Sequence, residues 1–480
     1  MGVWFSTGEM NFISSNIQEK IDKLKKIIGS WSARQLTLLG KITVLKSLAV
    51  SQLVYVLASL PTIHGALKEI NSLLYEFLWD AKNDKIKRSE MINDYDKGGL
   101  KMIDIESFNK SLKLKWIQGY LNDDNHAKWK LFFDYYLEKF GGKLVFLSNL
   151  STQDAASLDL TDPFLKEVLE HWTNLNYREE NLDFMNSYIW QNSLIRIGNQ
   201  PLFYPSWLEA GVTVVKDLVD IKQDFLSFDV FENKFQIKTN YLEYYKIRSA
   251  LKQYKKSCWL ETDKPHTESA VETIQSSQKV VKKLYKLLIE KKATHPSRTE
   301  EKWKREIQPF GNVTVDWKKS YQLPFLCTRD SKLRVFQFKL LHRRIATNDF
   351  LCKIGLEQTD LCSFCKETAE TLMHLFWNCR HTKLFWERTF EWITQNFKDL
   401  ENFKLSPSFC LGLIDNISDL LVHQIILIAR SYIYTCKFKS SLPKLEMFIQ
   451  LVKIAMKVGK QAALENNTVR AFEVKWSRLR

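Results

Sequence analysis

Glycine and proline are scarce in this chain, which contains 16 Gly and 10 Pro among 480 residues. Typical proteins contain about 7% Gly and 5% Pro, and the turns of sheet-rich folds depend on both residues. Long apolar runs are also missing, because no stretch of about 18 apolar residues occurs and no basic segment precedes an apolar one at the N-terminus. We therefore expect a mainly α-helical, intracellular protein that does not span a membrane.

Signatures of common enzymes are missing as well. The chain contains no G-x-x-x-x-G-K-[ST] phosphate loop, no G-x-S-x-G and no H-E-x-x-H motif. Polymerases hold two Mg²⁺ ions about 4 Å apart with carboxylates from different strands. The nearest match, Tyr120-Leu121-Asn122-Asp123-Asp124, has one residue too many for a Tyr-x-Asp-Asp turn and lies at a predicted helix end. We expect no catalytic residues and no small-molecule substrate.

Aromatic and basic residues are abundant. The chain has 15 Trp, 17 Tyr and 30 Phe, enough for packed interiors, and its length predicts two to four domains of about 100–200 residues. Lys and Arg outnumber Asp and Glu by 70 to 55, a net charge of +15. This charge is typical of proteins that bind polyanions, but also of many other soluble proteins.

Hydrophobic periodicity places several helices in the first 120 residues. A helical pattern runs from Ile17 to about Leu60, with a predicted break at Gly29, and a second amphipathic helix follows at 67–78. Gly98 and Gly99 have the composition of a tight hairpin turn with positive φ. Asp104 is a suitable cap for a third helix, which would bury one apolar side.

The rest of the chain is less regular in pattern. Residues 126–250 are predicted to be helical, and the polar stretch from Thr262 to Ser277 is the best candidate for a linker. The segment from Lys279 to Glu306 is strongly basic and is predicted to form a helix broken at Pro296. A solvated linker helix is the plainer explanation of that charge.

The clearest chemical motif is Cys362-x2-Cys365-x8-His374-x4-Cys379. Two cysteines separated by two residues can place both sulfurs on one ion, and a second pair completes a tetrahedron that suits Zn²⁺. Four protein ligands leave no position for water, so the predicted zinc is structural. Cys258, Cys327, Cys410 and Cys436 are expected to be buried, reduced thiols.

The spacing of the second ligand pair constrains the local structure. On a continuous helix, residues five apart lie about 140° from each other, so the helix must end between His374 and Cys379. Thr368 is the predicted cap at its start, and Trp377-Asn378 is where it would unwind. His381 is a weaker alternative as fourth ligand. Cys352, ten residues ahead of the first pair, is expected to be a core thiol.

A basic segment lies just before the motif, from Ser331 to Arg344. On a helix, Lys332, Lys339 and Arg343 would fall within about 40° of one another, beside an apolar stripe of Leu333, Phe336 and Leu340. This predicted basic rail could neutralise successive phosphates of RNA or DNA. A merely solvated helix face explains the pattern about as well. The candidate phosphate contacts are Lys332, Arg334, Lys339, Arg343 and Arg344, with Lys41 and Lys46 as weaker ones.

Two segments resemble a known family. The run from Trp31 to Ile42 (WSARQLTLLGKI) is similar to the segment just after the palm in reverse transcriptases of non-LTR, LINE-type retrotransposons. The sequence 2–6 looks like the last palm strand of that family, and Gly98-Gly99-Leu100 with Asp104 and Asn109 resembles its continuation towards the thumb. The stretch from Thr328 to Arg343, followed by the four ligands and Phe385-Trp386, resembles the family's reverse-transcriptase zinc-binding domain.

The resemblance implies a division of the chain and a function. It implies a palm remnant and thumb-like region at 1–122, a helical middle region at 123–262, a linker and basic helix at 263–306, the zinc-binding domain at 307–400 and a C-terminal helical region at 401–480. The fingers, the catalytic palm and the endonuclease of the family would be absent, as in a truncated element copy or a fragmentary gene model. We thus expect a non-catalytic fragment that binds RNA or DNA through a structural CCHC zinc module. The alternatives are a zinc-stabilised module for protein partners and a free-standing enzyme.

Overall fold

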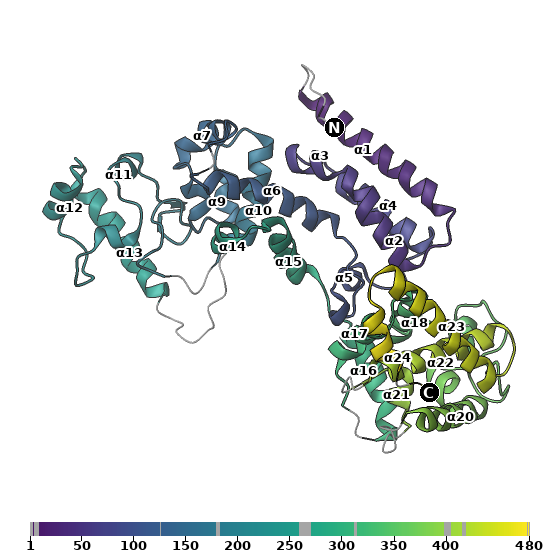
Figure 1. The fold of residues 1–480 in the computed structure, drawn as a ribbon. Coiled ribbons are helices and arrows are strands. Elements are labelled where there is room, and N and C mark those ends of the chain that lie inside the picture. The colour runs from purple at the N-terminus through teal and green to yellow at the C-terminus, as the bar shows by residue number, and fades with distance from the viewer. Residues whose placement is uncertain are drawn as a thin grey trace. The chain divides into compact units, whose positions relative to one another are not determined.

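The computed structural model describes residues 3, 9–124, 126–178, 183–258, 270–311, 314–397, 405–414, 419–477 and 479. Regular structure among them is almost entirely helical, as predicted (Figure 1). Paired strands within these ranges are limited to β1 (Arg196–Ile197) and β2 (Gln200–Pro201), which are antiparallel with Arg196 opposite Pro201. In the described part of the chain, no helix is both long and apolar enough to cross a membrane.

The α-helices follow one another with short connections. Those before residue 180 are α1 (Glu9–Ser32), α2 (Leu38–Val44), α3 (Val54–Ser59), α4 (Ala66–Trp79), α5 (Arg88–Met91), α6 (Ile105–Leu121), α7 (Lys130–Leu137), α8 (Leu144–Leu147), α9 (Thr152–Ser157) and α10 (Pro163–Asn176). Those between residues 200 and 310 are α11 (Pro205–Glu209), α12 (Phe228–Phe235), α13 (Tyr241–Cys258), α14 (Ala270–Ser276), α15 (Val280–Lys292) and α16 (Ser297–Ile307). The remainder are α17 (Trp317–Cys327), α18 (Ser331–Leu341), α19 (Asn348–Lys353), α20 (Arg380–Asn396), α21 (Pro407–Leu411), α22 (Leu420–Phe438), α23 (Leu445–Glu465) and α24 (Val469–Trp476).

These elements form two compact units, each assembled from separate stretches of chain. Unit 1 comprises the described residues of Met1–Ile28, Leu48–Leu73 and Asp104–Lys291. Unit 2 comprises those of Gly29–Ser47, Leu74–Ile103 and Lys292–Arg480. The five-part division expected from the sequence stays a prediction.

Unit 1 contains two groups of packed aromatic side chains. One joins α6, α7 and α10 around Tyr120, Phe133 and Trp172. The other joins α11, α12 and α13 around Trp207 and Tyr244. In both, large aromatic rings supply most of the buried apolar area, consistent with the high Trp, Tyr and Phe content.

The core of unit 2 surrounds α22, which is apolar on most of its faces. Its buried residues extend from Trp303 on α16 through Trp386 on α20 to Phe448 on α23. Figure 1 shows α16, α17, α18 and α20–α24 gathered in the green and yellow part of the chain. The cysteines of the CCHC motif belong to this same core, so the candidate metal centre is an integral part of unit 2.

Several predicted helix boundaries are confirmed. Asp104 caps α6, because its carboxylate accepts a hydrogen bond from the Ser107 N–H. The predicted helix at 67–78 is α4, and the basic segment is divided into α15 and α16 with Pro296 at the N-cap of the second. The predicted palm strand at 2–6 lies outside the described residues except for residue 3, as does most of the predicted linker, 259–269.

The expectations for the glycines are partly wrong. Helix α1 continues through Gly29 to Ser32, since an isolated glycine weakens a helix without ending it. Gly98 has positive φ, 77°, as predicted, but Gly99 does not, and no β-hairpin forms there. Instead the chain folds back on Asn93, and a Cβ at Gly99 would lie 2.1 Å from the Asn93 carbonyl oxygen. Gly99 is therefore required by a close backbone approach rather than by its φ.

Candidate metal centre

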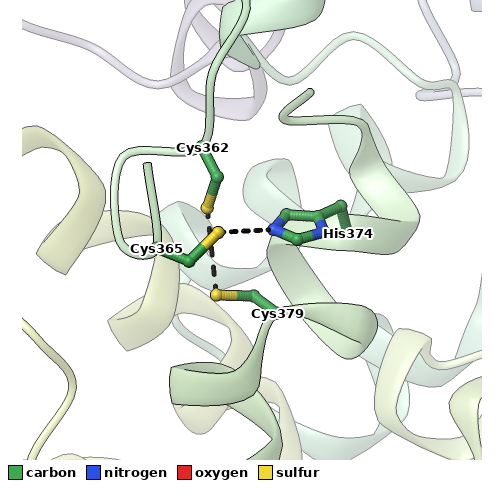
Figure 2. A group of neighbouring side chains, drawn as sticks. All are labelled: Cys362, Cys365, His374 and Cys379. Atoms are coloured by element: carbon green, nitrogen blue, oxygen red, sulfur yellow. Dashed lines mark hydrogen bonds between the residues drawn. The ribbon is translucent and has the colours of Figure 1, made fainter. Parts of the chain in front are cut away.

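The four residues of the CCHC motif meet at one point. Cys362 and Cys365 lie on a tight turn that follows the bridge between Leu361 and Ala369. His374 begins the π-helical turn η7 (His374–Asn378), and Cys379 is the N-cap of α20. Figure 2 shows all four side chains pointing towards one another. Their ligand atoms lie within 4.8 Å of one another.

The distances fit a tetrahedral zinc site. The Sγ atoms of Cys362 and Cys379 are 3.9 Å apart, and Cys365 Sγ is 3.4 Å from His374 Nε2. In a tetrahedron with Zn–S bonds of about 2.3 Å, neighbouring sulfurs are separated by about 3.8 Å. A disulfide needs a sulfur separation of about 2.05 Å. The arrangement thus suits a shared ion, and the three thiols and one imidazole are the soft donors that Zn²⁺ prefers.

The cysteine turn directs backbone groups towards the first sulfur. The Phe364 N–H donates to Cys362 Sγ at 3.4 Å, and the Lys366 N–H closes the turn by donating to the Cys362 carbonyl at 3.0 Å. Lys366 has φ of 60°, in the left-handed region. A thiolate at Cys362 is therefore partly satisfied by the backbone before any metal binds.

The path from His374 to Cys379 is close to the one predicted. The helix ends at Asn378, where the Cys379 N–H donates to the His374 carbonyl at 2.9 Å, and the backbone then becomes extended. The prediction of Thr368 as the cap is wrong. Thr371 has that role, since its hydroxyl accepts from the His374 N–H, while the Thr368 hydroxyl lies 3.1 Å from His374 Nδ1.

Electrostatics favours the thiolate of Cys379. The hydrogen bond from the Cys362 thiol lowers the pKa of Cys379 to about 4, and the backbone N–H groups of His381 and Thr382 contribute. These two N–H groups belong to the first turn of α20, where the helix dipole stabilises negative charge. Conversely, the hydrogen bond with Cys379 and burial raise the pKa of Cys362.

A buried ion pair holds the cysteine turn from behind. The Glu370 carboxylate accepts hydrogen bonds from the Ser363 N–H at 2.7 Å and the Asn348 N–H at 3.0 Å. Its other partner is Lys437 on α22, whose Nζ lies 2.9 Å from Oε1, and the Glu370 side chain has no solvent exposure. Sequence reasoning missed Glu370, Asn348 and Lys437. A pattern within one segment cannot show a contact between residues 67 positions apart, and a lysine within a helix normally indicates a solvated face.

The other cysteine and histidine candidates lie apart from the four ligands. His381 is on α20, where its ring accepts from Arg380 Nε at 3.4 Å. Cys352 is on α19 and only half-buried. Of the thiols expected to be buried, three are (Cys327, Cys410 and Cys436), whereas Cys258 is half-buried. All eight cysteines are free thiols in the structure.

The predicted basic rail does not form. Helix α18 ends at Leu341, and Arg343 has φ of 56°, so it leaves the face shared by Lys332 and Lys339. The Arg343 guanidinium instead forms two hydrogen bonds with Glu306, of 2.9 and 2.6 Å, and lies 4.4 Å from the ring of Trp303.

Other candidate phosphate contacts are also engaged within unit 2. Arg334 donates to the carbonyls of Thr328 and Phe325 at the end of α17. Lys41 is buried, with its Nζ 2.5 Å from Asp80 Oδ1. Burial lowers the pKa of Lys339, and the neighbouring Lys85 and Lys41 add to the effect. Lys332, Arg344 and Lys46 are exposed.

Comparison with known proteins identifies one part of the chain. The family model described as zinc-binding in reverse transcriptase matches residues 280–386, which include all four ligands of the CCHC site. No curated protein matches the chain. The chain is therefore related to reverse transcriptases through a region that contains its candidate zinc centre.

Proposed function

We propose that this chain is the non-catalytic, post-palm part of a non-LTR, LINE-type reverse transcriptase, and that it binds RNA or DNA. The observation that carries the proposal is the convergence of Cys362, Cys365, His374 and Cys379 within the matched region. The resemblance of residues 31–42 and 98–100 to the family's post-palm and thumb segments supports the same assignment.

The zinc ion would have a structural role in this function. Three thiolates and one imidazole complete a tetrahedral shell, which leaves no open position for water or substrate. The ligands come from the cysteine turn, η7 and the start of α20, three short segments that share one core. Bound zinc would hold these segments in register, and with them the exposed basic residues beside the site.

Charge supports nucleic acid as the partner. The net charge is +15, and the exposed cations Lys332 and Arg344 flank the core of unit 2. We place the phosphate contacts at these two residues, with Lys46 as a further one. Arg334, Arg343 and Lys41, which the sequence also suggested, are held by carbonyls or carboxylates, so their contribution would require these contacts to break.

Salt-dependent binding tests the proposal. We expect the zinc-loaded chain to bind a labelled RNA or DNA oligonucleotide with affinity that falls steeply as salt rises, measured by fluorescence anisotropy. For single strands each phosphate contact contributes about 0.7 to the slope of log affinity against log salt. Lys332→Ala and Arg344→Ala should each reduce the slope by about that amount.

The matched control is Lys222→Ala, which removes an exposed lysine of unit 1. It should leave the slope unchanged. Binding that ignores salt, or no binding, would contradict the nucleic-acid function. Absence of catalysis is tested separately, since Mg²⁺-dependent extension of a primed template by this chain would contradict the proposed non-catalytic role.

A protein-binding module is the second candidate, and one observation favours it. Helix α23 packs Phe448 and Val452 into the core, yet a second apolar stripe on the same helix is exposed. The stripe consists of Met447, Leu451, Ile454 and Val458, which are 37–63% exposed. Exposed apolar stripes of this kind mark surfaces for protein partners. Binding of nucleic acid that Ile454→Lys leaves unaltered would separate the two functions.

A further inference from the structure

Unit 1 contains an aromatic cleft far in sequence from the CCHC motif. The cleft has a volume of about 980 Å³ and is formed by α3, α6, the segment 122–129 and residues of α14 and α15. Tyr55, Trp116 and Trp129 are its aromatic lining residues, and Lys115 and Asp124 are among its charged ones. This volume is within the range of about 300–1,000 Å³ typical of small-molecule sites.

The floor of the cleft is rigid. The indole N–H of Trp116 donates to the Ala58 carbonyl at 2.8 Å, which fixes the ring between α6 and α3. Trp129 and Phe164 contact the same ring edge-to-face, at centroid distances of 4.9 and 5.8 Å. A ring held in this way is a stacking surface that loses no conformational entropy when a ligand binds.

Tyr55 supplies a second aromatic surface that the fold does not use. Its side chain is 53% exposed, whereas the following residues of α3, Val56 and Leu57, are buried. Within the described part of the chain, Tyr55 has no hydrogen bond and no ring partner. An exposed aromatic ring at the wall of an aromatic cleft has no role in packing, so a role in binding is the better explanation.

The polar groups of the cleft suit the edge of a base. Lys115 is an exposed cation, while Asn122, Asp124 and Gln275 offer amide and carboxylate groups that can pair with ring nitrogens and exocyclic amines. The carboxylates of Asp123 and Asp124 disfavour a phosphate cluster, although Asp123 is paired with Lys143. Aromatic faces with polar groups at the side are the features that recognise unstacked bases.

We propose that this cleft binds an unpaired nucleobase of single-stranded RNA or DNA, stacked on Tyr55 and Trp116. The inference rests on the proposed nucleic-acid function and adds a specificity to it. Bases in a duplex are stacked on each other and cannot enter a cleft of this size, so the chain should discriminate single strands from duplexes through unit 1.

Tyr55→Ala tests the inference, because this exposed residue can be removed without opening the core. Stacking of one base on an aromatic residue contributes about 1–3 kcal/mol, which corresponds to a loss of about 5- to 100-fold in affinity. We expect that loss for a 12-nucleotide single-stranded RNA labelled with fluorescein and no loss for the 12-base-pair duplex. Tyr55→Trp should keep the affinity for the single strand.

The matched control is Tyr135→Ala on α7, which removes a tyrosine that is 78% exposed and does not line the cleft. It should leave both affinities unchanged. A photoreactive 5-iodouracil in the single strand should crosslink to Tyr55, Trp116 or Trp129, as mapped by mass spectrometry. If the wild-type chain binds single strands and Tyr55→Ala binds them equally well, the cleft proposal is wrong and the nucleic-acid function stands. If the wild-type chain binds no nucleic acid, both are wrong.

Discussion

Glu370 is the residue on which the geometry of the cysteine turn depends most. Its carboxylate joins three elements, because the donors come from the turn itself, from the start of α19 and from α22. A charge with no solvent exposure is tolerated only when its hydrogen bonds are satisfied and an opposite charge is near. Lys437 provides that charge and also donates to the Asn348 side chain at 2.6 Å.

Removing one partner of this pair should cost more than removing both. We expect Glu370→Gln or Lys437→Met to lower the free energy of unfolding by about 3–5 kcal/mol, since each leaves a buried charge unpaired. The double variant should lose less than the sum of the two single ones. Urea unfolding of the four zinc-loaded proteins, followed by tryptophan fluorescence, measures the coupling. The exposed pair Lys353–Asp349 is the control, and Lys353→Ala should cost less than about 1 kcal/mol.

The zinc ligands allow a second test at the residue scale. Cys362→Ser should abolish stoichiometric zinc, measured by elemental analysis of the purified protein, and should lower its melting temperature. Treatment of the wild-type protein with a chelator should have the same thermal effect. Cys352→Ser is the control, because this thiol lies outside the four-ligand group. Equal zinc content in both variants would contradict the assignment of the ligands.

At the scale of elements, local signals were predictable and distant ones were not. The N-cap at Asp104, the division at Pro296 and the end of the helix before Cys379 depend on neighbouring residues, and the sequence contains those. The length of α18 depends instead on Arg343 meeting Glu306, 37 positions earlier. Helical periodicity alone extends the helix to Arg343, so the predicted rail was wrong. The four ligands were found because their spacing is itself the signal.

Two glycines in helical or turn segments should respond in opposite ways to alanine. Gly29 lies within α1, where a Cβ would have nothing within 4 Å, so Gly29→Ala should raise the free energy of unfolding by about 0.5–1 kcal/mol. Gly99→Ala should lower it, because the Cβ would overlap the Asn93 backbone. Thermal melting of the two variants beside the wild type measures the signs. A neutral Gly99→Ala would show that the turn at 98–100 can shift at little cost.

At the scale of the whole molecule, stability should depend on pH through a histidine buried in unit 2. His342 lies under the turn at Gly98, with Nε2 2.7 Å from the Gly98 carbonyl oxygen, and its ring packs against Phe338 and Tyr321. Burial lowers the pKa of His342 to about 4. Glu90, 3.6 Å from Nδ1, does not reverse the shift, because burial raises its own pKa and favours its neutral form.

The sign of the pH dependence follows from this shift. In the unfolded chain the pKa of a histidine is about 6.5, so between about pH 6.5 and 4 the unfolded state binds the extra proton. The contribution of His342 is complete above pH 6.5 and is lost as the pH falls towards 4, by up to about 3 kcal/mol. His342→Gln should flatten this part of the stability curve, measured by urea unfolding at several pH values. His64→Gln, at an exposed position of unit 1, should leave the curve unchanged.

The interleaving of the two units along the chain has a consequence for synthesis. The polypeptide passes from one unit to the other five times, and about 190 residues of unit 1 separate the second segment of unit 2 from its third. At about 5–20 residues per second, the ribosome needs roughly 10–40 s to make that stretch. During this time the apolar residues of segment 74–103 have emerged without the helices that cover them. Unit 2 is therefore a candidate for chaperone protection during translation, and a release at any codon before α22 would leave its first two segments without a core to join.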